Sequence, residues 1–239
     1  MADKSCSEQG ADNKITTYKE RSLHSSLKAY FCPDESMHEI KIGRFFADAC
    51  DGTKIFEIQT GSLGPLEKKI KFYLENTELD IVIVHPIAKD RKIYWLDGEG
   101  ELQGTPKLSS SHKSLADGIS DLYYLRNYIG DPRVSFCFVL MEIDEVRLLD
   151  GYGKNKKIRA TSVDRVAGEI YSVHYVRSVA DVREIILPML PSSPFTREEL
   201  SKSLKLKAMR LWSAQKLLCE LEIVSCERDG KKLLFQKLV

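Results

Sequence analysis

Two short apolar runs joined by a tight turn constrain the fold of this chain more than any other feature. Residues 45–60 read FFADACDGTKIFEIQT. An Asp-Gly pair between two apolar runs is a strong signal for a β-hairpin. Because side chains alternate along a strand, we expect Glu57 and Gln59 on one face of the second strand and Phe56 and Ile58 on the other.

Three polar residues interrupt the apolar pattern of this hairpin. Asp48 lies on the first run, and Glu57 and Gln59 lie on the second. Carboxylates on paired strands supply the hard oxygen ligands that Mg²⁺ prefers. The hairpin therefore predicts a divalent-cation site in which Asp48 and Glu57 hold Mg²⁺ or Mn²⁺.

The segments around the hairpin alternate between helical and strand patterns. Residues 16–31 and 66–76 have apolar residues at helical spacing, whereas residues 79–87 are almost continuously apolar, as in a strand covered on both faces. Strand, helix and strand in this order imply a parallel crossover. Because proline cannot donate to a ladder, we expect Pro86 to end that strand and residues 92–97 to form a shorter one after it.

The order helix, strand, strand, helix, strand resembles the core of the PD-(D/E)XK nuclease superfamily, with Asp48 on one strand and Glu57-x-Gln59 on the next. The resemblance implies an α/β fold with a restriction endonuclease-like mixed sheet flanked by helices. It also implies a metal-dependent nuclease in which Asp48, Glu57 and Gln59 are catalytic. Gln59 stands where the superfamily usually has lysine, and some restriction enzymes carry glutamine there.

The same resemblance adds one residue from each flanking helix to the expected site. Glu20, in the helix at 16–31, is the candidate for a third metal ligand, with a capping-box partner of Thr17 as the alternative. Lys69, in the helix at 66–76, is the candidate to supply the charge of the missing lysine. The alternative for Lys69 is an ordinary solvated lysine.

Composition excludes several other classes of protein. The 239 residues carry 36 Lys+Arg and 35 Asp+Glu, so there is no global nucleic-acid signature, although a local basic patch suffices for a nuclease. Phosphate-loop, G-x-S-x-G and H-E-x-x-H motifs are missing, which removes the commonest nucleotide-binding, hydrolase and zinc-protease classes. No apolar run reaches the length of a membrane span, so we expect no membrane partner.

The N-terminus and the cysteines predict a cytoplasmic protein. Residues 1–14 have no hydrophobic signal region and are expected to form a disordered tail. The six cysteines are scattered and include no C-x-x-C pair, which is typical of reduced thiols.

The end of the chain is expected to form a second domain. Pro188, Pro191 and Pro194 mark a linker, so we expect a nuclease-like domain over 15–190 and a small domain over 191–239. In the latter, a pattern of three helices and then two strands around an Arg-Asp-Gly turn resembles a winged-helix domain.

In winged helices the third helix commonly enters the DNA major groove and the wing touches the backbone. We expect the third helix at about residues 213–221. This domain holds ten Lys/Arg and six Asp/Glu over residues 195–239, which favours DNA over a protein as the partner. The candidate nucleic-acid contacts are outward groups of the third helix and basic residues of the wing: Ser213, Gln215, Lys216, Arg228, Lys231 and Lys232.

Three functions therefore stay open. The first is a metal-dependent nuclease that cleaves phosphodiester bonds, with DNA as the favoured substrate and the winged helix assisting its binding. The second is a non-catalytic DNA-binding protein that retains a nuclease-like fold, and the third is a protein-interaction module. Because many restriction-like nucleases act as dimers, the resemblance also suggests a homodimer.

Overall fold

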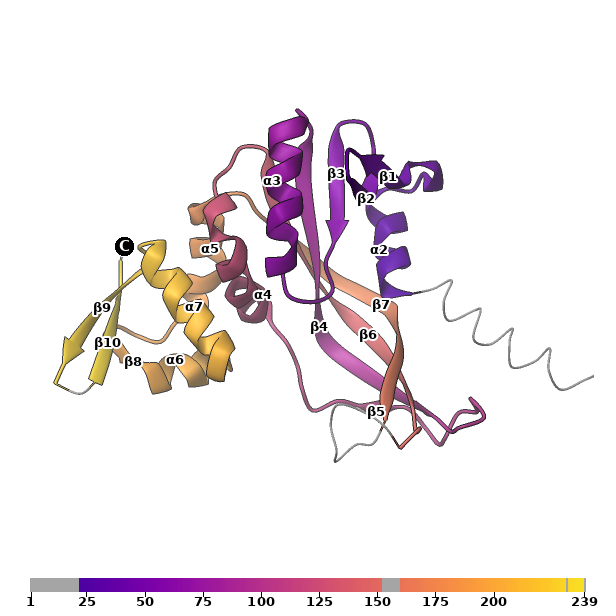
Figure 1. The fold of residues 1–239 in the computed structure, drawn as a ribbon. Helices are drawn as coiled ribbons and strands as arrows, with labels where there is room; N and C mark the ends of the chain where they lie inside the picture. The colour runs from indigo at the N-terminus through magenta and orange to yellow at the C-terminus, as the bar shows by residue number, and fades with distance from the viewer. Residues whose placement is uncertain (1–21, 152–159, 231, 239) are drawn as a thin grey trace, which may run out of the picture.

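A computed structural model describes residues 22–151, 160–230 and 232–238 (Figure 1). The expected tail at 1–14, the beginning of the helix expected at 16–31, and Glu20 lie outside these residues. The helices are α2 (Leu23–Phe31), α3 (Glu67–Asn76), α4 (Leu115–Leu122), α5 (Val179–Ile186), α6 (Arg197–Leu204) and α7 (Ala208–Glu220), with short 3-10 helices at Glu35–Met37, Gly64–Leu66, Tyr123–Tyr128 and Leu187–Met189. The strands are β1 (His38–Ile42), β2 (Phe45–Cys50), β3 (Lys54–Ile58), β4 (Asp80–Leu96), β5 (Lys107–Leu108), β6 (Val134–Leu148), β7 (Thr161–Val176), β8 (Phe195–Thr196), β9 (Val224–Asp229) and β10 (Lys232–Lys237).

The larger unit is a mixed α/β structure built on a large mixed sheet flanked by helices. Its strand order is β1-β2-β3-β4-β6-β7, and β5 pairs with β4. The predicted hairpin is confirmed, because β2 and β3 are antiparallel neighbours on either side of the Asp51-Gly52 turn. The predicted parallel crossover is also confirmed: β3 and β4 are parallel, and α3 lies between them in the chain.

Pro86 lies inside β4, so the expectation that this strand ends there is wrong. The main-chain N–H of Gln59 donates to the Val84 carbonyl at 2.8 Å, so this peptide group of β4 faces β3. Pro86, two residues further on, faces the same side, but the pairing of β4 with β3 ends at Val84. The missing N–H of Pro86 therefore removes no hydrogen bond between β4 and β3. On its other side, β4 continues to pair with β6.

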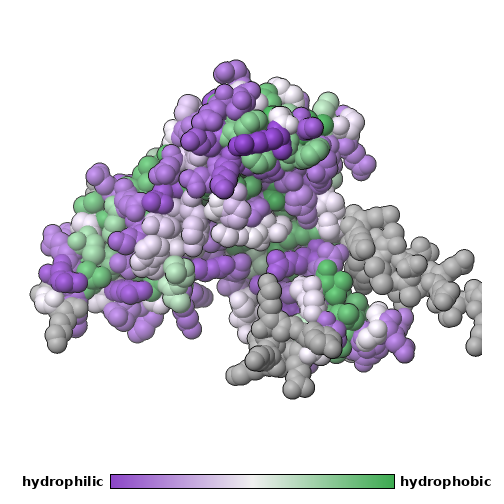
Figure 2. Space-filling view, in the orientation of Figure 1, coloured by the Kyte–Doolittle hydropathy of each residue, from purple (hydrophilic) through white to green (hydrophobic). Residues whose placement is uncertain are grey.

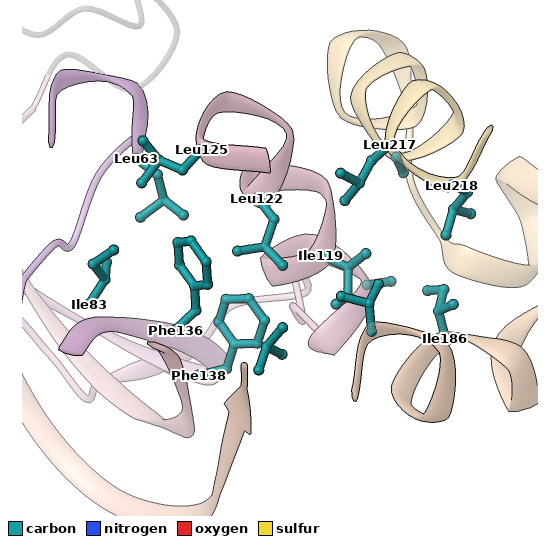
Figure 3. Packing of buried hydrophobic residues seen from close by; sticks show 14 of the residues in the cluster. Leu63, Ile83, Ile119, Leu122, Leu125, Phe136, Phe138, Ile186, Leu217 and Leu218 are labelled. Atoms are coloured by element: carbon teal, nitrogen blue, oxygen red, sulfur yellow. The ribbon is translucent and has the colours of Figure 1, made fainter. Parts of the chain in front are cut away.

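Helices cover the two faces of the sheet differently. On one face α2 packs through Leu23 and Leu27. On the other face lie α3 and α4, and α4 also packs on α5 and α7, so it joins the sheet to the C-terminal elements (Figure 1). Figure 3 shows this continuous core, in which Phe136 and Phe138 of β6 lie below Leu122 of α4 and the side chains extend to α5 and α7.

The distal halves of β4, β6 and β7 extend beyond the helices as a long ribbon that also carries β5 (Figure 1). The face of the molecule in Figure 2 is mainly hydrophilic, and its hydrophobic residues form small, separated areas. Over the ranges that the structure describes, no helix is both long and apolar enough to cross a membrane.

The C-terminal elements form a small sheet with the order β8-β10-β9, together with α6 and α7. The expectation of three helices after residue 195 is wrong. Residues 208–220 form one uninterrupted helix, α7, rather than a short helix and a longer one. Its apolar side chains Leu211, Ala214, Leu217 and Leu218 lie at helical spacing and are all buried, which favours a single helix.

Candidate active site

Glu57 is buried at the centre of the candidate site. It lies on β3, is 2 % exposed, and accepts hydrogen bonds on both carboxylate oxygens. Lys69 Nζ donates to Oε2 at 2.6 Å, and the Tyr73 hydroxyl donates to Oε1 at 3.0 Å. Because Lys69 and Tyr73 are four residues apart on α3, they share one face of that helix, which places both donors over the same carboxylate.

Asp48 is held by different partners. It lies on β2, where its Oδ2 accepts a hydrogen bond from the main-chain N–H of Ile58 at 2.6 Å. His24 Nε2, from α2, lies 3.2 Å from the same oxygen. The carboxylate therefore ties the end of β3 to the first turn of α2.

The two carboxylates belong to one electrostatic unit although helices on opposite faces of the sheet hold them. Pairing of Ala49 with Phe56 sets the register that brings Asp48 beside Glu57. The negative charge of Asp48 raises the pKa of Glu57, while the ammonium of Lys69 lowers the pKa of both groups.

Their environments move the two pKa values in opposite directions. Burial raises the pKa of Glu57 to about 7, with a contribution from Asp48, even though Lys69 and Tyr73 oppose this. Burial acts on Asp48 in the same direction, but the hydrogen bonds from His24 and Ile58 outweigh it and lower the pKa of Asp48. Asp48 is therefore ionised near neutral pH, whereas Glu57 titrates there, a divergence that is typical of functional carboxylate pairs.

Gln59 follows β3 directly and is engaged in the loop after it. Its side-chain Nε2 donates to the Ser62 carbonyl at 2.6 Å. His85 Nδ1 lies 2.6 Å from the Gln59 carbonyl, and His85 Nε2 lies 3.3 Å from Asp121 Oδ2. Because a carbonyl only accepts, Nδ1 carries a proton, and the chain Asp121–His85–Gln59 links α4 to the end of β3. The lysine beside Glu57 is Lys69, from α3.

Comparison with known proteins places these residues in a family. Residues 21–177 match the model of a family described as "Domain of unknown function (DUF8091)", and this match spans about two-thirds of the chain. The chain belongs to the DUF8091 family. It is also similar to an uncharacterized protein of Treponema pallidum (strain Nichols), with 27% identity over 179 residues that cover 74% of this chain and 70% of the relative. No solved structure matches the chain.

The DUF8091 match contains Asp48, Glu57, Gln59 and Lys69 and ends at residue 177, one residue beyond the end of β7. The candidate active site therefore lies wholly inside the family domain. The C-terminal unit lies outside the match.

The candidate nucleic-acid contacts of the C-terminal unit differ in exposure. The expectation that Ser213 faces outward is wrong, because it is 2 % exposed. Gln215 is half-buried, and its Oε1 is buried without a hydrogen-bond partner among the described residues. Lys216, Arg228 and Lys232 are exposed, and Lys231 lies outside the described residues.

Asp48 and Glu57 offer carboxylate oxygens, the ligand type that hard divalent cations prefer. In the described ranges, no group of three or more His, Cys, Asp or Glu side chains is arranged to hold a metal ion. Asp48 and Glu57 supply two carboxylates, and Mg²⁺ is commonly bound through one or two carboxylates together with water and substrate phosphates. The residues present fit Mg²⁺ or Mn²⁺ of this kind, and they do not fit a site built entirely from protein ligands.

Tyr73 and His24 were not predicted from the sequence to contact the site residues. Tyr73 reaches Glu57 from α3, and His24 reaches Asp48 from α2. His85, for which packing at a strand end was favoured over a position facing the metal site, contacts the Gln59 carbonyl from β4. One weak signal exists in the sequence, since Tyr73 stands four residues after Lys69.

Proposed function

We propose that this DUF8091 protein is a metal-dependent nuclease that cleaves phosphodiester bonds, with DNA as the favoured substrate. The observation that carries the proposal is the contact between Lys69 and the buried Glu57, with Asp48 beside them. Two carboxylates and one lysine are the groups that the PD-(D/E)XK pattern brings together. Here the lysine comes from the helix that follows the motif rather than from position 59.

Each residue has a role that follows from its contacts. Asp48 and Glu57 would hold the cation, and His24 and Tyr73 position them through the hydrogen bonds described above. When bound, the cation would polarise the scissile phosphate and lower the pKa of the attacking water. Lys69, which donates to Glu57, would stabilise with its ammonium the negative charge that develops on the phosphate oxygens.

The restriction endonuclease-like fold is part of this proposal. The order α2-β2-β3-α3-β4, with antiparallel β2 and β3 and parallel β3 and β4, supports it.

A winged-helix fold for the C-terminal unit is also proposed. The element order α5-β8-α6-α7-β9-β10 and the sheet order β8-β10-β9 support it. On this interpretation α5 is the first helix and α7 the third, so the unit begins near residue 178 rather than at 191. Lys216, Arg228 and Lys232 are exposed and remain its candidate contacts with DNA.

Cleavage assays test the proposed function. Labelled single-stranded DNA, duplex DNA and RNA are incubated with the protein in Mg²⁺, in Mn²⁺ and in EDTA. We expect cleavage with either cation and none in EDTA. Glu57→Gln should abolish it, whereas Glu75→Gln, an exposed glutamate on the same helix as Lys69, should leave it unchanged. Equal rates for the Glu57 variant and the parent would refute the proposal.

A non-catalytic DNA-binding protein is the second candidate. One observation favours it: Lys69 and Tyr73 already satisfy both carboxylate oxygens of Glu57. DNA binding by the parent with no cleavage of any substrate, in either cation, would establish this second function in place of the first.

A further inference from the structure

Three basic side chains line one small cavity near the end of β3. Arg91 of β4, Lys113 of the loop before α4 and Arg165 of β7 line a cavity of about 50 Å³, together with Thr60, which directly follows Gln59. Since one water molecule occupies about 30 Å³ in the liquid, such a cavity holds a group of only a few heavy atoms.

The positive charge in this cavity is only partly compensated. Arg91 forms an ion pair with Glu145 at 3.2 Å, but Glu145 also binds Arg147 at 2.9 Å. Across the described residues, neither Lys113 nor Arg165 forms an ion pair. An anion in the cavity would therefore meet two cations that form no direct ion pair with a described carboxylate.

The charges around Lys113 also favour an anion in this cavity. Burial lowers its pKa, and the nearby charges of Arg210 and Arg91 lower it further, against the opposing effect of Asp117 and Asp121. Lys113 is half-buried, and an anion in the cavity would reduce the repulsion between its ammonium and the guanidinium groups of Arg91 and Arg210.

The basic cavity shares lining residues with a second, larger cavity. This second cavity has a volume of about 390 Å³ and shares Thr60 and Arg165 with the first. It is also lined by His24, the residue that contacts Asp48. Asp164 lines the larger cavity too, and its carboxylate would repel an anion there. The anion-binding end is therefore the one formed by Arg91, Lys113 and Arg165.

We propose that Arg91, Lys113 and Arg165 bind a phosphate group of a nucleic-acid strand that lies across the candidate active site. This inference rests on the proposed function, since it assigns a neighbouring phosphate of the same substrate. A phosphate is small enough for the cavity, and its charge compensates the cations that face it.

Binding is measured separately from cleavage to test this proposal. The anisotropy of a labelled single-stranded oligonucleotide and of its duplex is followed in EDTA, with Glu57→Gln as the parent. We expect Lys113→Met to weaken binding roughly three- to tenfold and to reduce the salt dependence by about one phosphate contact. Arg165→Met should act in the same way, and Lys107→Met, at an exposed lysine of β5, serves as the matched control.

Thermal unfolding with and without inorganic phosphate gives a second readout. Without phosphate, Lys113→Met should unfold at the same temperature as the parent or higher, because a repulsive charge is removed. Phosphate should raise the unfolding temperature of the parent and not that of the variant. Parent-like oligonucleotide binding by both Lys113→Met and Arg165→Met would overturn the proposal, and a phosphate response without any change in oligonucleotide affinity would assign the site to a free phosphate instead.

The two proposals fail in different ways. Oligonucleotide binding that depends on Lys113, with no cleavage by the wild-type protein, would refute the nuclease and leave the phosphate site standing. Cleavage by the wild-type protein together with unaltered binding by both variants would refute the phosphate site alone.

Discussion

Replacing Glu57 by glutamine should change how stability depends on pH. The pKa of this carboxyl is raised from 4.5 to about 7, mainly by burial. At about 1.36 kcal/mol per pH unit, the difference corresponds to about 3 kcal/mol. Because the pKa is raised, the folded state favours the protonated carboxyl. The stability that the protonated Glu57 carboxyl contributes is therefore complete below pH 4.5 and is lost as the pH rises through 7. The amide of the Glu57→Gln variant has no proton to lose, so the variant escapes this loss.

The measurement is urea unfolding at pH 5, 6, 7 and 8, in EDTA so that no cation stabilises the ionised carboxylate. We expect the free energy of unfolding of Glu57→Gln, minus that of the parent, to increase by about 2.5 kcal/mol between pH 5 and 8, because part of the difference already lies below pH 5. Taking the difference removes the titration of all other groups. Glu75→Gln, at an exposed side chain, should show no such trend.

Two results would refute this reasoning. A difference that does not vary with pH would mean that the pKa of Glu57 is unperturbed. A difference that decreases with pH would mean that Lys69 outweighs burial and holds the carboxylate ionised. The expected result would show that the fold tolerates an unfavourable carboxylate, as proteins do where the group is needed for function.

Three further predictions concern the neighbours of this carboxyl and the packing above it. Lys69→Met should abolish cleavage, since it removes the positive charge beside Glu57. Lys68→Met, at the exposed neighbouring position, should leave the cleavage rate unchanged, and rates measured for the two variants test this prediction. Gln59→Lys should keep or raise the cleavage rate, and Gln59→Ala should lower it less than Lys69→Ala does, because a charge-assisted contact outweighs a neutral one. Gly118→Ala should destabilise the protein by roughly 1–3 kcal/mol in urea unfolding, because a Cβ there would lie only 2.7 Å from a methyl carbon of Ile87 and 3.0 Å from the ring of Phe138.

Local signals in the sequence were enough to predict the part of the fold that carries the candidate site. The β2–β3 turn follows from Asp51-Gly52, whose conformational preference is a property of the two residues themselves. Helix α3 follows from its apolar spacing, and the same helix carries Lys69 to the Glu57 carboxylate. The choice of Lys69 over Lys68 depended on which side of that helix faces the sheet, and this too is a local property.

Features that depend on tertiary context were not predicted. The continuation of β4 past Pro86 depends on where the pairing with β3 ends, which no local pattern shows. The burial of Ser213 depends on how α7 packs on the rest of the protein, including α4, which lies far away in the sequence. In the same way, His85 of β4 pairs with Asp121 of α4, 36 positions later in the chain, so the local sequence around either residue does not predict its partner.

A crystal of the wild-type protein soaked in Mn²⁺ tests the central claim most directly, because the anomalous signal of manganese locates the ion without reference to activity. We expect a manganese peak within coordination distance of carboxylate oxygens of both Asp48 and Glu57, with Lys69 still beside Glu57. Saturating Mn²⁺ with no peak at these two carboxylates, and with both oxygens of Glu57 still bound only by Lys69 and Tyr73, would contradict it.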